Sequence, residues 1–182
     1  GGLHGVGSSV VNALSEYLDI TIKTGGLISH DRYERGKPSV ELINGLLPVL
    51  GNTNRTGTKV NFKPDPEIFE TTRFKSDEIK SRLHETAYLN PALTIYYKDL
   101  RGPLFEEETY HEPEGLSGFV RDMNKNNETL TDVIYFKGAS EGITVECAFQ
   151  YINEFHEDVM GFCNCIYNAE GGSHITGFKT QF

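Results

Sequence analysis

The opening of the chain constrains its fold more than any other feature. Four glycines fall within the first seven residues, and an apolar pattern with helical spacing follows at once. Glycine leaves backbone N–H groups unshielded, and a helix N-terminus adds a positive dipole beside them. The spacing predicts a helix from Ser8 to Leu18, with Ser8 and Ser9 as candidate N-cap residues. The pattern therefore predicts a phosphate-binding loop before a helix, although a plain turn has the same appearance.

Three blocks of sequence together carry a family resemblance. Residues 1–7 running into residues 9–15 are similar to the ATP-lid segment of the B subunits of bacterial type II topoisomerases, the family of DNA gyrase and topoisomerase IV. Residues 55–65 are similar to the strand that closes the ATP pocket in that family, and residues 170–178 resemble the start of a long transducer helix. The likeness runs from end to end of the chain, with gyrase favoured over topoisomerase IV.

Composition sets limits on function. The chain of 182 residues carries a net charge of −9, the wrong sign for a module that holds DNA mainly through its phosphates. No apolar run approaches the roughly 20 residues that span a bilayer, so we expect no membrane contact and a cytoplasmic location. A first residue other than methionine leads us to expect a fragment of a longer protein.

The three cysteines give little sign of a special role. Their odd number argues against a secreted disulfide framework, and no histidine stands at a zinc-binding spacing from them. We expect reduced structural thiols. The second cysteine of Cys163-Asn164-Cys165 departs from the family pattern, in which asparagine or a small polar residue is expected.

Strand and helix patterns predict an α+β architecture rather than a doubly wound sheet. In the first half, strands are expected at residues 19–23, 28–35 and 58–63, with a Gly25-Gly26 turn between the first two. Further along the chain, helices are expected at residues 76–90 and 116–123, and strands at 93–98 and from 133. Residues 143–151 alternate as a half-buried strand, which we expect to pair with residues 158–165.

The resemblance assigns these elements to two domains. Residues 1–104 look like the latter part of a Bergerat-type (GHKL) ATPase α/β sandwich. Residues 105–182 look like the start of a transducer domain with a ribosomal-protein-S5-like fold.

The resemblance also implies an ATP site. The amides of Leu3, His4, Gly5, Val6 and Gly7 would wrap the phosphates, and Gly2 would allow the tight entry of the loop. Thr58 would read the adenine, and Val60 would pack near the ring. Consecutive amides at a helix start bind anions without lysine, which agrees with this assignment. On residue type alone, His4 could equally pack within the lid, and Thr58 would be an ordinary strand threonine. Thr24 stands where many members carry arginine, which leaves coumarin-type inhibitor binding open.

The family's other catalytic groups lie outside this sequence. The water-activating glutamate and the Mg²⁺-binding asparagine would precede it, and the transducer lysine would follow it. The resemblance implies ATP and Mg²⁺ as cofactors. It implies DNA and the gyrase A protein as partners, with B subunits that dimerise on ATP binding within an A2B2 complex that supercoils DNA negatively. We expect the segment alone neither to hydrolyse ATP nor to relax DNA.

Two other classes remain as alternatives. One is another ATPase of the same superfamily, such as a heat-shock chaperone or a MutL-like mismatch-repair protein. The other is a non-catalytic interaction module in which the glycine loop is only a turn. The amino-acid sequence of residues 3–7 and the block around Thr58 favour the topoisomerase over both alternatives.

Overall fold

A computed structural model describes residues 5–103 and 105–181, and these divide into two compact units. Unit 1 comprises the described residues up to Arg73, and unit 2 begins at Phe74. This division by compactness does not test the domain boundary predicted between residues 104 and 105, which refers to the domains of the family. That boundary stays a prediction.

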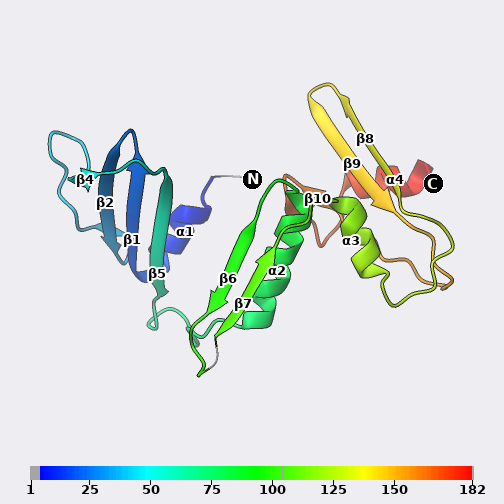
Figure 1. Ribbon diagram of the computed structural model, residues 1–182, viewed down its shortest axis with the longest axis horizontal. Coiled ribbons are helices and arrows are strands. Elements are labelled where there is room, and N and C mark those ends of the chain that lie inside the picture. The colour runs from blue at the N-terminus through cyan, green and yellow to red at the C-terminus, as the bar shows by residue number, and fades with distance from the viewer. Residues whose placement is uncertain (1–4, 104, 182) are drawn as a thin grey trace. The chain divides into compact units, whose positions relative to one another are not determined.

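Unit 1 is an antiparallel sheet preceded by a short helix (Figure 1). The sheet order is β3-β2-β1-β5, and β4 pairs with the same edge of β2 as β3 does. The bounds are α1 Gly7–Ala13, β1 Ser15–Thr24, β2 Leu27–Glu34, β3 Lys37–Pro38, β4 Val49–Asn52 and β5 Gly57–Pro64.

Strand β1 lies inside this sheet, because it pairs with β2 along one edge and with β5 along the other. Its side chains alternate between the two faces of the sheet. Leu18, Ile20 and Ile22 lie on one face, opposite Phe62, Val60 and Thr58 of β5. Residues 17, 19, 21 and 23 lie on the other face. Among the described residues of unit 1, Leu18 is the one apolar residue that is buried, with 4% of its surface exposed.

The first helix is shorter than the sequence pattern predicts. It ends at Ala13, and β1 begins at Ser15, so Tyr17 and Leu18 are strand residues. Their pairing with both β2 and β5 outweighs the helical spacing of the apolar residues. The N-cap is Val6, and Ser8 lies inside the helix, so the predicted serine cap is wrong as well.

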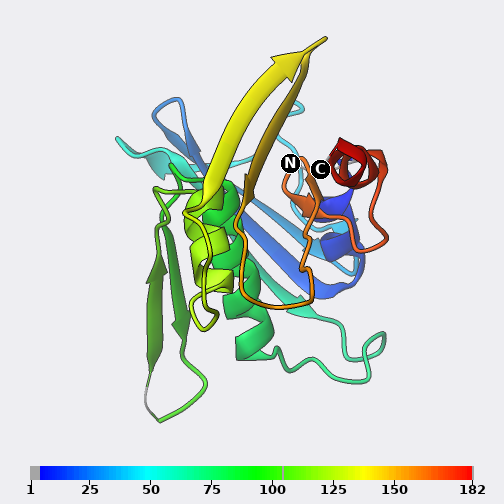
Figure 2. The same ribbon diagram turned by 90° about the vertical axis from the view of Figure 1, so that its right-hand side faces the viewer.

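Unit 2 combines a helix–hairpin layer with a second hairpin. Helix α2 (Ser76–Leu89) contacts β6 (Ile95–Asp99) and β7 (Glu106–Tyr110), which pair antiparallel. Helix α3 (Leu116–Met123) contacts α2 and the hairpin formed by β8 (Ile134–Ser140) and β9 (Ile143–Phe149). Figure 1 and Figure 2 both show this hairpin extending beyond α3. The remaining elements are β10 Phe162–Cys163, β11 Ile166–Tyr167 and α4 Ser173–Gln181.

The core of unit 2 lies where α2 meets the β6–β7 hairpin and α3. Ala87, Tyr88 and Tyr110 are buried there. The Tyr88 ring stacks on Phe119 of α3, with centroids 4.9 Å apart and planes 2° from parallel. Burial raises the pKa of Tyr88 to about 12, because the neighbouring apolar groups disfavour the phenolate.

The strand pairing predicted for the last third of the chain is wrong. Strand β9 pairs with β8, not with residues 158–165, and β10 pairs with β11 instead. The turn residues Glu141 and Gly142 have φ angles of 52° and 80°, as a tight two-residue hairpin turn requires. The turn brings seven residue pairs of β8 and β9 into register at little cost in chain entropy. Pairing with residues 158–165 would require the closure of a longer loop.

All the strand pairs among the described residues are antiparallel, which confirms the predicted α+β class. In the part of the chain that the structure describes, no helix has both the length and the apolar character needed to cross a membrane.

Candidate functional site

The predicted phosphate loop is described in part. Gly2, Leu3 and His4 lie outside the described residues, whereas Gly5, Val6 and Gly7 lie at the start of α1. Gly5 has a φ of 65°, a conformation that side-chain-bearing residues rarely adopt. A Cβ placed on Gly5 or Gly7 would meet no heavy atom of the described residues within 4 Å. The backbone at the start of the helix is therefore open to a ligand.

The amides at this helix start are suited to an anion. The Val10 N–H donates to the Val6 carbonyl at 2.9 Å, which closes the first turn of α1. Helix geometry leaves the N–H groups before Val10 without intrahelical acceptors. These donors, together with the helix dipole, favour negative charge at this end. The residues present thus fit a phosphate group.

Thr58 and Val60 lie on β5 in the same unit. Their strand partners are Ile22 and Ile20 of β1, so the two residues share the apolar face of the sheet. Val60 is 53% exposed on that face. A hydroxyl beside exposed apolar side chains suits a flat base, because the hydroxyl can donate or accept a hydrogen bond and the apolar surface can cover a ring.

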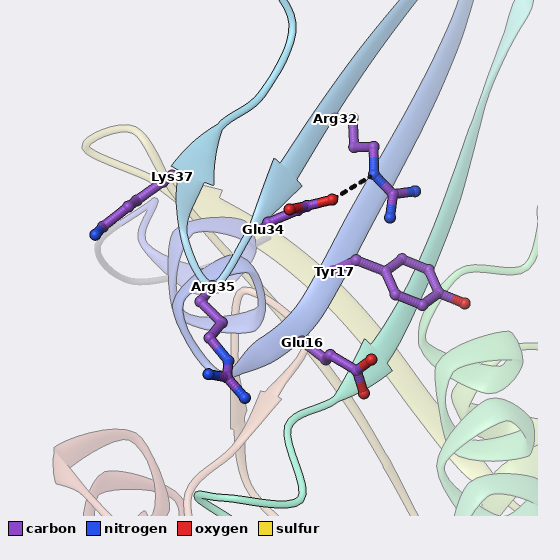
Figure 3. A pocket seen from close by; sticks show the side chains of 6 residues that line it. All are labelled: Glu16, Tyr17, Arg32, Glu34, Arg35 and Lys37. Atoms are coloured by element: carbon purple, nitrogen blue, oxygen red, sulfur yellow. Dashed lines mark hydrogen bonds and ion pairs between the residues drawn. The ribbon is translucent and has the colours of Figure 1, made fainter.

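The opposite face of the sheet is charged. Arg32 donates to Asp19 at 2.8 Å and to Glu34 at 3.3 Å, and its guanidinium lies 5.0 Å from the centre of the Tyr17 ring. The hydrogen bond to Asp19, followed by that to Glu34, raises the pKa of Arg32. Figure 3 shows Tyr17, Arg32 and Glu34 around a shallow surface depression whose lining also includes Glu16, Arg35 and Lys37. Because this depression is lined from the charged face, it is separate from Thr58 and Val60.

The region where α1 meets β1 holds a buried carboxylate that the sequence did not reveal. The side chain of Asp65, just after β5, is 2% exposed, and it accepts from the Nε of Arg35 at 2.8 Å. The two residues are 30 positions apart. In the sequence, Asp65 stands between two prolines, and Arg35 precedes a glycine between two strands. Neither pattern indicates that the two side chains form an ion pair.

No metal site assembles among residues 5–103 and 105–181. No group of three or more His, Cys, Asp or Glu side chains there is placed to hold a metal ion. Cys163 and Cys165 are exposed, and Cys147 is half-buried, with its pKa raised by burial.

Comparison with known proteins gives consistent matches. A family model described as DNA gyrase B matches residues 115–182. The chain is 46% identical over 179 residues to the B subunit of DNA gyrase from Archaeoglobus fulgidus, a match that covers 98% of this chain and 28% of that protein. It is also 46% identical over 182 residues to the B subunit of DNA topoisomerase 4 from a Staphylococcus epidermidis strain, which covers 99% of this chain and 27% of that protein.

A solved structure agrees with the fold. The 43K ATPase domain of Thermus thermophilus gyrase B, crystallised with an aminocoumarin, superposes with a TM-score of 0.81 at 32% identity. The match covers 97% of this chain and 47% of that one. The chain therefore spans little more than a quarter of the curated relatives and about half of this ATPase domain.

Proposed function

This chain belongs, as a segment, to the family of DNA gyrase and topoisomerase IV B subunits, and on that premise we propose that it forms part of the ATP-binding and transducer region of an ATP-hydrolysing type II DNA topoisomerase. We assign the chain to gyrase, which supercoils DNA negatively. Topoisomerase IV is the alternative, because relatives of both kinds are 46% identical to this chain.

The open backbone at Gly5 and Gly7, around the first residue of α1, is the observation that carries the proposal. In the proposed site, the amides of residues 3–7 bind the nucleotide phosphates, and Gly2 allows the tight entry of the loop. The Thr58 hydroxyl hydrogen-bonds the adenine, and Val60 covers one side of the ring. Bound ATP supplies the phosphoanhydride bond whose cleavage drives DNA passage, and Mg²⁺ offsets its charge.

The proposed partners follow from the same assignment. The protein acts on DNA in the cytoplasm, together with the gyrase A protein, and two B subunits dimerise on binding ATP within an A2B2 complex. The net charge of −9 supports a role for this segment away from the DNA itself.

A titration of the full-length protein with a non-hydrolysable ATP analogue tests the phosphate loop. Gly7→Ala is the more specific variant, because Gly7 lacks a positive φ and an added Cβ meets no described atom within 4 Å. The methyl group instead occupies space that a phosphate would approach. We expect the affinity to fall about tenfold or more, the loss that accompanies roughly 1.4 kcal/mol.

Gly51→Ala is the matched control. Gly51 lies in β4 of the same unit, and an added Cβ there also meets nothing within 4 Å. We expect its affinity for the analogue to equal that of the unaltered protein. Equal affinity in the Gly7→Ala variant would instead favour the non-catalytic module, in which the glycine loop is only a turn.

A further inference from the structure

We propose that Arg35 and Asp65 are positioning residues that fix the phosphate-loop helix α1 relative to the adenine strand β5. This inference rests on the proposed function, because it concerns the same nucleotide site. Neither residue belongs to the proposed ligand set. They act near the C-terminal ends of α1 and β5, whereas the proposed ligands Gly7 and Thr58 lie at the N-terminal ends of these two elements.

The backbone of Asp65 holds the end of helix α1. Leu14 is the C-cap residue of α1, and its carbonyl accepts from the Asp65 N–H at 3.0 Å. The final carbonyls of a helix have no intrahelical donor, so this bond satisfies one of them from the segment that continues β5. The position of α1 thus depends on the position of Asp65.

The side chain of Asp65 is held in turn by Arg35. The Arg35 Nε lies 2.8 Å from one carboxylate oxygen of Asp65, and its Nη2 lies 3.5 Å from the other. The Glu67 N–H also donates to the carboxylate, at 2.9 Å. A carboxylate that is 2% exposed needs such partners, because an unpaired buried charge is strongly destabilising.

Arg35 is fixed by its place in a tight turn. Figure 3 shows it where β2 gives way to β3. The φ angles of Arg35 and Gly36 are 49° and 77°, and the Arg35 N–H donates to the Glu16 carbonyl at 3.2 Å. An added Cβ on Gly36 would lie 3.5 Å from the Cα of Ala13, the last residue of α1. The turn therefore lies against the helix that the ion pair anchors.

A second carboxylate holds the exposed side of Arg35. Glu67 accepts from its Nη2 at 2.6 Å, and this bond, followed by the charge of Asp65, raises the pKa of Arg35. The guanidinium stays charged at any pH the protein meets. The clamp, defined as Arg35, Asp65 and Glu67, thus joins the β2–β3 turn to the segment after β5.

The test compares variants of the full-length protein. Arg35→Gln is preferred over Asp65→Asn, because the altered side chain is 52% exposed and glutamine keeps an N–H donor for the buried Asp65 carboxylate. Arg35→Lys keeps the charge but loses the two-nitrogen geometry. Arg32→Gln is the matched control, because it removes an arginine of the neighbouring strand β2 from its ion pair with Asp19 on the same sheet.

Two measurements are made on each variant: amide hydrogen exchange of the free protein, and affinity for a non-hydrolysable ATP analogue. In Arg35→Gln, we expect the amides of residues 10–14 to exchange about tenfold faster while those of β1 and β2 keep their rates. We expect affinity for the analogue to fall about tenfold, within the range of couplings carried by residues that do not touch a ligand. Arg35→Lys should give exchange rates and affinities between those of Arg35→Gln and those of the unaltered protein. Arg32→Gln should give the same values as the unaltered protein.

Three results would overturn the clamp. They are unchanged exchange in residues 10–14, faster exchange spread evenly over the sheet, and unchanged affinity for the analogue despite a loosened helix. Absence of analogue binding by the unaltered protein is a different outcome, which refutes the proposed function itself.

Discussion

At the scale of single residues, some polar contacts of this molecule join segments that are distant in sequence. Arg35 forms an ion pair with Asp65, and the hydroxyl of Ser76 at the start of α2 donates to Asp99 at the end of β6. Charged residues are frequent throughout the sequence, and nothing in its local pattern says which of them pair. The glycine loop and Thr58 can be singled out from the sequence because a family motif surrounds them. The clamp cannot, since only the folded sheet brings its members together.

Asp99 provides a test of unit 2 by pH. The Arg101 guanidinium, followed by the Ser76 hydroxyl at 2.7 Å, holds the pKa of this carboxyl well below its usual value of 3.8. A folded-state pKa below the unfolded value contributes stability above the unfolded pKa, and this contribution is lost as the pH falls through the folded value. We expect Asp99→Asn to lower the unfolding free energy of unit 2 at pH 7.

Denaturant titrations from pH 7 to pH 2 check this expectation. The difference in unfolding free energy between the unaltered protein and Asp99→Asn should be constant above about pH 5 and should narrow as the pH falls below 3.8. Asp132→Asn, at an exposed position, serves as the control. A gap that stays constant down to pH 2 contradicts the account.

At the scale of helices and strands, sequence patterns locate most elements but misplace boundaries and partners. Periodicity predicts both the helix at residues 116–123 and the strand beginning at Ile143. The same kind of pattern makes helix α1 too long, because Tyr17 and Leu18 fit helical spacing as well as strand alternation. Periodicity reports which face of an element is apolar. It does not report which neighbour covers that face.

The packing of α2 on α3 offers a test at this scale. Tyr88 is 6% exposed and stacks on Phe119 and, at 4.6 Å, on His84. Removal of a buried aromatic ring typically costs about 3–5 kcal/mol, because the surrounding side chains do not close the cavity. We expect Tyr88→Ala to destabilise unit 2 by about that amount in denaturant unfolding.

Tyr96 supplies the comparison for this variant. It lies on β6 in the same unit and is 79% exposed, so Tyr96→Ala should change stability by no more than about 0.5 kcal/mol. Equal losses from the two substitutions would show that the aromatic stack is not the core of unit 2.

At the scale of the whole molecule, the chain has two compact units in which few of the described apolar residues are buried. Leu18 is the buried one in the described part of unit 1, while β5 leaves Val60 half exposed. The solved ATPase domain that this chain resembles is about twice as long as the matched region. The α+β class follows from the sequence, because strand and helix patterns are local. The strand order β3-β2-β1-β5 does not, since it depends on the pairing of β1 with β5, which residues 25–56 separate along the chain.

The central claim is that unit 1 carries the phosphate and adenine contacts of a nucleotide site. Amide hydrogen exchange of the full-length protein, with and without a non-hydrolysable ATP analogue, tests it most directly. Bound nucleotide should slow exchange at residues 5–9, at the start of α1, and along β5 around Thr58, by about tenfold or more. The amides of the β8–β9 hairpin should keep their rates. Saturating analogue that leaves exchange at both residues 5–9 and β5 unchanged would contradict the account.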